Sequence, residues 1–208
     1  MKKFAAVSVT GALALACLSV ALPAAAQDVP KAEVSGGYQL LHIWGEADGE
    51  SGSETLSKGW YGDVAGNLTK SLGIVFQVSG NYKTLQESVS NSGLTITATA
   101  HVRVHQFLGG MRVNARPNRT VTAFGQILLG AFNTSGTGEA SVTAGGETTT
   151  ATSEGESSTD FALQVGGGVN VMLSKTVGVR GGADYVRVFE KDTPFNGVRV
   201  VVGAVFAF

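Results

Sequence analysis

Apolar and polar residues alternate with a period of two through much of this 208-residue chain. The pattern is clearest at the C-terminus, where one face of an extended segment would carry Val198, Val200, Val202, Ala204, Phe206 and Phe208. Successive side chains of a β-strand point to opposite faces, so the alternation predicts strands of about ten residues. After residue 27 there is no apolar run long enough (about 18 residues) for a membrane-spanning helix.

Residue size differs between the two faces of these segments. The more polar face is built from Gly, Ala, Ser, Asn and Gln, whereas the apolar face carries the bulky side chains. A soluble barrel places its apolar groups inside. A transmembrane barrel turns bulky apolar residues toward lipid and polar residues toward the lumen. The sequence therefore predicts an all-β fold, an eight-stranded antiparallel up-and-down transmembrane β-barrel.

We expect eight strands, at residues 32–43, 58–68, 72–89, 94–115, 120–133, 159–173, 176–189 and 197–208. Short turns join them at 69–71, 116–119 and 174–175, and longer connections lie at 44–57, 86–95, 134–158 and 190–196. Short periplasmic turns and long external loops are typical of outer-membrane barrels. An even number of strands then places both termini in the periplasm.

Two of the long connections contain hairpin signals. Gly145-Gly146 and Asn91-Ser92-Gly93 each lie between Thr-rich segments, so we expect hairpins without an apolar face that extend the barrel above the membrane. Acidic residues gather in the long connections and basic residues in the short turns. We interpret the acids as solubilising the loops, and bridging of divalent cations to anionic lipid is the alternative.

The first 26 residues have the pattern of a cleaved secretory signal peptide. Lys2 and Lys3 precede an apolar stretch that ends in small residues, which predicts cleavage between Ala26 and Gln27. The alternatives are a membrane anchor and a lipoprotein acylated at Cys17, which lacks the usual Leu three residues earlier. We therefore expect a signal peptide at 1–26 and an outer-membrane β-barrel domain at 27–208.

Composition excludes several classes of protein. Charged residues make up 15% of the chain and the formal net charge is −1, without a Lys/Arg cluster. A disordered chain would be more charged and less apolar, and a nucleic-acid-binding protein would be basic. Cys17 is the only cysteine, which rules out a disulfide framework and a Cys-based zinc site. We expect no cofactor and no metal.

Acids and bases in equal number fall on the face predicted to line the lumen. They are Glu33, Asp63, Arg112, Arg180, Asp184 and Arg199. Buried charges must be paired, so we interpret them as ion pairs that fill a narrow barrel. The geometry of the last hairpin places Asp184 opposite Arg199. The functional alternative is an ion gate, in which the charges exchange partners to open a path.

Several segments, in order, resemble one known family. They are Val34–Leu41, Gly59–Gly80, Phe107–Arg112, Gly166–Gly168, Val179–Tyr185 and Val202–Phe208. Together they resemble the outer-membrane protein β-barrel domain family of small OmpA-like and OmpX-like barrels, over essentially the whole mature chain. The resemblance implies an eight-stranded barrel in a Gram-negative outer membrane, without implying one activity. It also implies that Phe206 and Phe208 form a C-terminal signal read by the barrel assembly machinery.

Histidine placement bears on enzymatic function. A lipid A deacylase of the small-barrel type would need a Ser nucleophile beside a His, and none of His42, His101 and His105 is followed two residues later by Ser. His101 and His105 would lie about 13 Å apart on one strand, too far to share a metal. The aromatic residues near strand ends suggest two interfacial girdles: Trp44, Trp60, Tyr82, Phe132, Tyr185 and Phe189 at the outer end, with Phe206 and Phe208 at the other.

These features favour a non-catalytic outer-membrane protein with a structural role in the envelope and a role in surface interactions. A narrow-pore channel for ions or small solutes is the first alternative, and a lipid A-modifying enzyme is the second. The expected partners are outer-membrane lipid, lipopolysaccharide and the barrel assembly machinery, with the protein itself a monomer and no nucleic acid bound.

Overall fold

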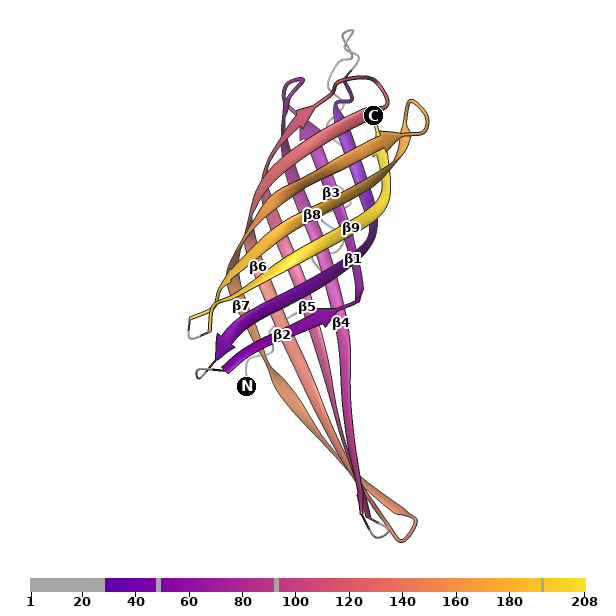
Figure 1. Ribbon diagram of the computed structural model, residues 1–208, viewed down its shortest axis with the longest axis vertical. Helices are drawn as coiled ribbons and strands as arrows, with labels where there is room; N and C mark the ends of the chain where they lie inside the picture. Colours follow the sequence, from indigo (N-terminus) through magenta and orange to yellow (C-terminus); the bar gives the residue numbers. More distant parts are fainter. Residues whose placement is uncertain (1–28, 48–49, 92–93, 192) are drawn as a thin grey trace, which may run out of the picture.

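The computed structural model describes residues 29–47, 50–91, 94–191 and 193–208. They form one antiparallel sheet, which the pairing of β1 with β9 closes into a ring (Figure 1). The strands are β1 (Ala32–Ala47), β2 (Glu50–Leu56), β3 (Lys58–Asn67), β4 (Leu72–Asn91), β5 (Leu94–Ala115), β6 (Val121–Ala144), β7 (Glu147–Met172), β8 (Val177–Phe189) and β9 (Phe195–Ala207). Among these residues no helix is long and apolar enough to cross a membrane. The predicted all-β up-and-down barrel is confirmed.

The ring runs through eight strands because β2 and β3 serve as two pieces of one. Both pair with the same edge of β1, β3 along Ala32–Tyr38 and β2 along Leu41–Ala47. The register advances by one residue between the two pieces, as in a β-bulge, and the Tyr38 hydroxyl donates a hydrogen bond to the Ser57 carbonyl at the break. The predicted long connection at 44–57 is therefore wrong. Backbone pairing with β1 keeps most of it extended although its side chains are weakly apolar.

The three predicted short turns are confirmed, and each is held by one polar side chain. Thr69 Oγ1 accepts hydrogen bonds from the backbone of Ser71 and Leu72, at 3.2 and 3.0 Å. Asn118 Oδ1 and Ser174 Oγ accept equivalent bonds in the other two turns. Asn, Ser and Thr favour turns because their side chains can replace a backbone acceptor in this way.

The two ends of the barrel wall meet beside these short turns. Lys31 N donates to the Phe208 carbonyl at 2.6 Å, and Ala207 N donates to the Thr176 carbonyl at 2.9 Å. The start of β1, the end of β9 and the turn before β8 therefore lie together. The signal peptide expected at 1–26, with its cleavage site at Ala26 and Gln27, lies outside the described residues.

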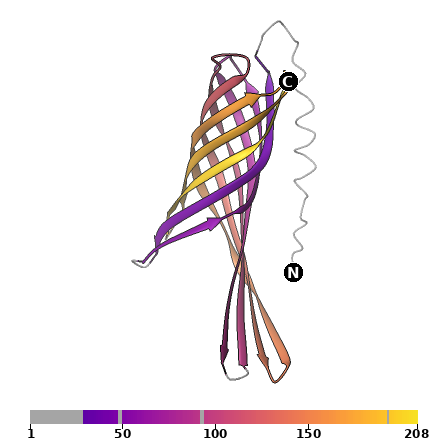
Figure 2. The same cartoon turned by 45° about the vertical axis from the view of Figure 1, so that its right-hand side comes forward.

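At the opposite end, β4, β5, β6 and β7 continue past the other strands as a narrow extension (Figures 1 and 2). The β4–β5 pairing reaches Asn91 and Leu94, and the β6–β7 pairing reaches Ala144 and Glu147. The two predicted hairpins are confirmed, so the connections expected at 86–95 and 134–158 are mostly strand. Gly145 and Gly146 have φ of +60° and +90°, the left-handed conformation that a tight hairpin turn requires.

The outer surface of the barrel carries a band of exposed apolar side chains. It includes Ile74, Phe76, Phe107, Met111, Ile127, Leu129, Val169, Val200 and Val202. Toward the extension the two faces exchange character: Val104 and Phe132 are buried inside, and Arg103 is exposed on the outer face. Apolar inside and polar outside is the arrangement of a soluble barrel. The exchange therefore marks the level at which the wall leaves lipid.

Aromatic residues lie on the outer face at this level. Trp60, Tyr82, Tyr185 and Phe189 are exposed, and Trp60 Nε1 donates to the Tyr82 hydroxyl at 3.2 Å. The prediction for Phe132 is wrong, because this ring is 1% exposed and packs edge-on against Phe195 inside the barrel, with ring centroids 5.4 Å apart.

Candidate functional site

The half of the barrel interior nearer the short turns holds a continuous network of charged side chains. Arg180 Nη1 lies 2.6 Å from Asp63 Oδ2, and Arg180 Nη2 lies 3.2 Å from Glu33 Oε2. Arg112 Nη2 contacts the same Asp63 carboxylate at 3.2 Å. All four side chains are buried. Asp63 on β3 is thus shared between two arginines, one on β5 and one on β8.

A second part of the network lies closer to the extension. Arg199 Nη1 donates to Asp184 Oδ2 at 2.8 Å. Gln126 joins the two parts, because its Nε2 donates to Asp184 at 3.0 Å and its Oε1 accepts from Arg112 Nη2 at 2.7 Å. The structure therefore brings all six lumen charges named from the sequence into one cluster.

Sequence reasoning missed the glutamines of this cluster and one further arginine. Gln39 and Gln77 accept from Arg199 at 2.6 and 2.8 Å. Arg116, which the sequence placed in a turn, reaches back to Glu33 at 3.0 Å. The signal for the glutamines was their position on the same strand faces as the charges, where a carboxamide serves as a neutral donor and acceptor.

Aromatic rings pack against the buried guanidinium groups. The ring of Phe124 lies 4.5 Å from the Arg112 guanidinium carbon and 4.9 Å from that of Arg180, and Arg199 lies 5.3 Å from the Tyr61 ring. Cation–π contacts of this kind help to keep desolvated arginines charged. The arginines are held from several sides, which favours one fixed arrangement.

A mostly apolar layer lies between the charged network and the extension. Its buried apolar members are Leu41, Leu56, Val104, Leu108, Leu128, Phe132, Ala162, Val186 and Val188, and Ser79, Asn81 and Gln106 are buried among them. Ile43, Val102 and Phe195 pack against them. An apolar constriction opposes ion passage because an ion there loses its water without gaining new ligands. The interior therefore combines a charged network with a packed layer that is mostly apolar.

The histidines contact single polar side chains. His42 Nδ1 lies 2.8 Å from Thr55 Oγ1, His101 Nδ1 lies 3.0 Å from Thr84 Oγ1, and His105 Nε2 lies 3.4 Å from the Tyr82 hydroxyl. Within the described ranges, no group of three or more His, Cys, Asp or Glu could hold a metal ion.

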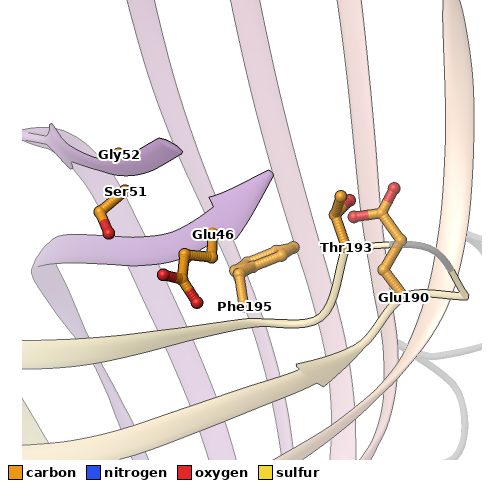
Figure 3. Close-up of a pocket in the computed structure, with 7 residues that line it drawn as sticks. Glu46, Ser51, Gly52, Glu190, Thr193 and Phe195 are labelled. Atoms are coloured by element: carbon orange, nitrogen blue, oxygen red, sulfur yellow. The ribbon is translucent and has the colours of Figure 1, made fainter. Parts of the chain in front are cut away.

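A hollow of about 400 Å³ opens at the end of the barrel opposite the short turns, beside the end of β1. Figure 3 shows the side chains around it, which are Glu46, Ser51, Glu190, Thr193 and Phe195. Gly45 and Gly52 also line it, and neither has a side chain to fill the space. The hollow is acidic, but its two carboxylates alone do not make a binding site.

Basic side chains accompany the aromatic residues on the outer face. Lys58 and Arg103 are exposed and lie on either side of Tyr82 in the strand register. At the other end of the barrel, Phe206 and Phe208 are 43% and 71% exposed on the outer face. The basic and aromatic side chains thus lie together near the extension, and the two terminal phenylalanines lie at the opposite end of the barrel.

The family model described as outer membrane protein beta-barrel domain matches residues 10–208. The chain belongs to this family. An outer-membrane location follows from the family together with the barrel fold. No curated protein matches this chain.

Solved structures of small outer-membrane barrels are similar to this family member. Ail, the attachment invasion locus protein of Yersinia pestis, in complex with the heparin analogue sucrose octasulfate, has a TM-score of 0.50 and 16% identity, covering 86% of this chain and 99% of Ail. Neisserial surface protein A has a TM-score of 0.48 and 12% identity, covering 86% and 97%. The protease OmpT of Escherichia coli has a TM-score of 0.38 and 8% identity, covering 85% and 96%. At these identities the likeness concerns the fold alone.

Proposed function

We propose that this protein is a non-catalytic outer-membrane barrel that supports the envelope and presents its β4–β7 extension to the outside for surface interactions. The observation that carries the proposal is the contrast between a filled interior and a long exposed extension. The interior is occupied by the charged network and the apolar layer, so its side chains stabilise the barrel. The extension is the part whose exposed surface is available to a binding partner.

The orientation we propose follows from the turns. The short turns and the ends of β1 and β9 lie at one end, which would face the periplasm, and the extension lies at the other. Ail is named for attachment, and we propose the same broad class of role here. The protein would act as a monomer.

Lipid contacts would help to anchor the barrel. Lys58 and Arg103, beside Trp60 and Tyr82, are suited to the phosphates of lipopolysaccharide, because aromatic residues prefer the interface and cations pair with phosphate. Phe206 and Phe208 would be read by the assembly machinery during insertion.

A channel function receives less support from the structure of the interior. Ions would have to pass Leu41, Leu128 and Phe132, which are buried together in the apolar layer. Opening that path would require several packed side chains to move at once. A lipid-modifying enzyme receives less support too, since the hydrogen-bond partners of the histidines are Thr and Tyr hydroxyls and none is the serine that such an enzyme would use.

Site-specific labelling tests this proposal. Cys17 is the only native cysteine and falls in the expected signal peptide, so single cysteines can be introduced without background. A membrane-impermeant maleimide should label Thr97→Cys in the extension on intact cells, and Lys175→Cys in a short turn only after permeabilisation. Labelling of Lys175→Cys on intact cells, with Thr97→Cys protected, would contradict the proposed orientation.

A trimmed variant separates the two roles. Leu85 pairs with Ala100 and Gly138 pairs with Ser153, so residues 86–99 and 139–152 can each be replaced by Asn-Gly. In a strain lacking the protein, the trimmed barrel should restore resistance to detergent but not attachment to surfaces. Restored attachment would remove the extension from the proposed function.

A further inference from the structure

The extension has one apolar face, contrary to the expectation that its Thr-rich strands would have none. The register places the apolar residues of its four strands on the same side: Leu85, Val89, Leu94, Ile96, Ala98, Ala100, Ala140, Val142, Ala144 and Ala151. Val89, Ile96 and Val142 form one row across three strands and are 69%, 45% and 41% exposed. A sheet with an apolar face normally buries it against another layer.

The opposite face is made of hydroxyl groups that bind one another. Ser88 contacts Thr97 at 2.8 Å, Ser90 contacts Thr95 at 3.0 Å, and Thr143 contacts Thr148 at 2.8 Å. These pairs link neighbouring strands, so the hydroxyl face stabilises the extension by itself. The apolar face is the one left to gain from a partner.

Charge limits the kind of partner. Residues 84–100 and 137–153 contain no Lys or Arg, and their charged residues are Glu87, Glu139 and Glu147. Glu87 and Glu147 belong to the apolar face, on β4 and β7 at its two edges, whereas Glu139 belongs to the hydroxyl face. The exposed apolar row therefore lies between two carboxylates.

We propose that this face binds a cationic amphipathic polypeptide segment of another protein. Its alternate apolar side chains would pack on Val89, Ile96 and Val142, and its Lys or Arg side chains would reach Glu87 and Glu147. A second copy of this chain fits less well, because pairing two such faces brings together only acidic edges. The inference rests on the proposed external position of the extension.

The experiment measures binding of fluorescent ten-residue peptides to the folded full-length protein in lipid nanodiscs. The probes alternate Val with Lys, Val with Thr, and Val with Glu. The Lys peptide should bind more tightly than the Thr peptide, and the Glu peptide should not bind. Raising the salt concentration should weaken the binding of the Lys peptide, because exposed ion pairs are screened.

Matched variants locate the site. Ile96→Thr with Val142→Thr should weaken binding of the Lys peptide by about tenfold or more, since apolar contact is lost from a still-folded sheet. Glu87→Gln with Glu147→Gln should weaken it severalfold, whereas Glu139→Gln on the hydroxyl face should leave it unchanged. Heat-modifiable migration on gels verifies that each variant is folded.

Three results would overturn the inference. They are equal binding of the Lys and Glu peptides, an equal effect of Glu139→Gln and the Glu87/Glu147 pair, and self-association of the wild type that Ile96→Thr with Val142→Thr abolishes. The binding assay uses purified protein, whereas the proposed orientation is tested by labelling of Thr97→Cys on cells. Failure of one is therefore distinguishable from failure of the other.

Discussion

Asp184 on β8 and Arg199 on β9 lie directly opposite each other, and Arg199 Nη1 donates to Asp184 Oδ2 at 2.8 Å inside the barrel. Asp184 is 4% exposed and Arg199 is 1% exposed. Neither charge can be left alone in such a place without a large desolvation cost. The pair is therefore a structural requirement of the last hairpin as well as a part of the interior network.

Separating this pair should destabilise the barrel. We expect Asp184→Ala and Arg199→Ala each to lower the free energy of unfolding in lipid by about 3–5 kcal/mol, because each leaves one buried charge. The double variant should cost clearly less than the sum of the two. Denaturant titration of all three variants gives the coupling, and Asp184→Ala combined with Glu87→Gln in the extension is the additive control. Simple additivity for the pair would mean that the two residues do not stabilise each other.

A charge in the outer apolar band should be costly. Ile127 is 55% exposed on β6 in the middle of this band, and Ile127→Arg should lower the free energy of unfolding in lipid by about 2–4 kcal/mol. Val142→Arg, on the same strand but in the extension, should have little effect, because that part stands in water. Equal effects of the two substitutions would show that the band does not mark the membrane.

The Glu54–Lys83 ion pair links β2 to β4 on the extension side of the barrel. The Lys83 ammonium, followed by the Thr55 backbone N–H, lowers the pKa of Glu54 below its ordinary value of 4.5. A lowered pKa means that the contact stabilises the fold above that value and is lost as the pH falls through the folded-state pKa. NMR titration of the Glu54 carboxyl should show a lowered midpoint, which Lys83→Met should raise. An unchanged midpoint in that variant would rule out Lys83 as the cause.

Phe208 should matter more for assembly than for stability. Its backbone carbonyl accepts from Lys31 and Ala32, whereas its side chain is 71% exposed. Phe208→Ala keeps the backbone bonds, so refolding into lipid in vitro should be nearly normal while the outer-membrane yield in cells falls. Phe208→Tyr, which keeps the aromatic ring, should restore the yield. Normal yield of the alanine variant would refute this role.

Period-two alternation was sufficient to predict the two faces of the wall and its strands other than β2. Arg199 alternates with Val198 and Val200, and a charge within lipid has to point inward. The same reasoning predicted that Asp63, Arg112 and Arg180 point into the lumen. These residues lie in the part of the barrel where the outside is lipid, so the rule applies directly to them.

The rule fails where the wall leaves the membrane. Phe132 shares its face with Gln126 and Leu128 and therefore points inward, although its position near a strand end suggested a girdle. Above the aromatic residues the outside is water, so an apolar side chain belongs inside. The apolar face of the extension was missed because its segments were classified by their high threonine content. Thr95 and Thr97 in fact alternate with Leu94, Ile96 and Ala98.

Electrical recording in planar lipid bilayers tests the central claim, that the interior is sealed by the charged network and by the mostly apolar layer between this network and the extension. Protein whose folding is verified by heat-modifiable migration should add no discrete, steady conductance to the bare membrane. Because Leu41, Leu128 and Phe132 are packed in the buried layer, moderate voltage should not open a path. Reproducible single-channel openings of the wild-type protein would contradict the account and favour a channel.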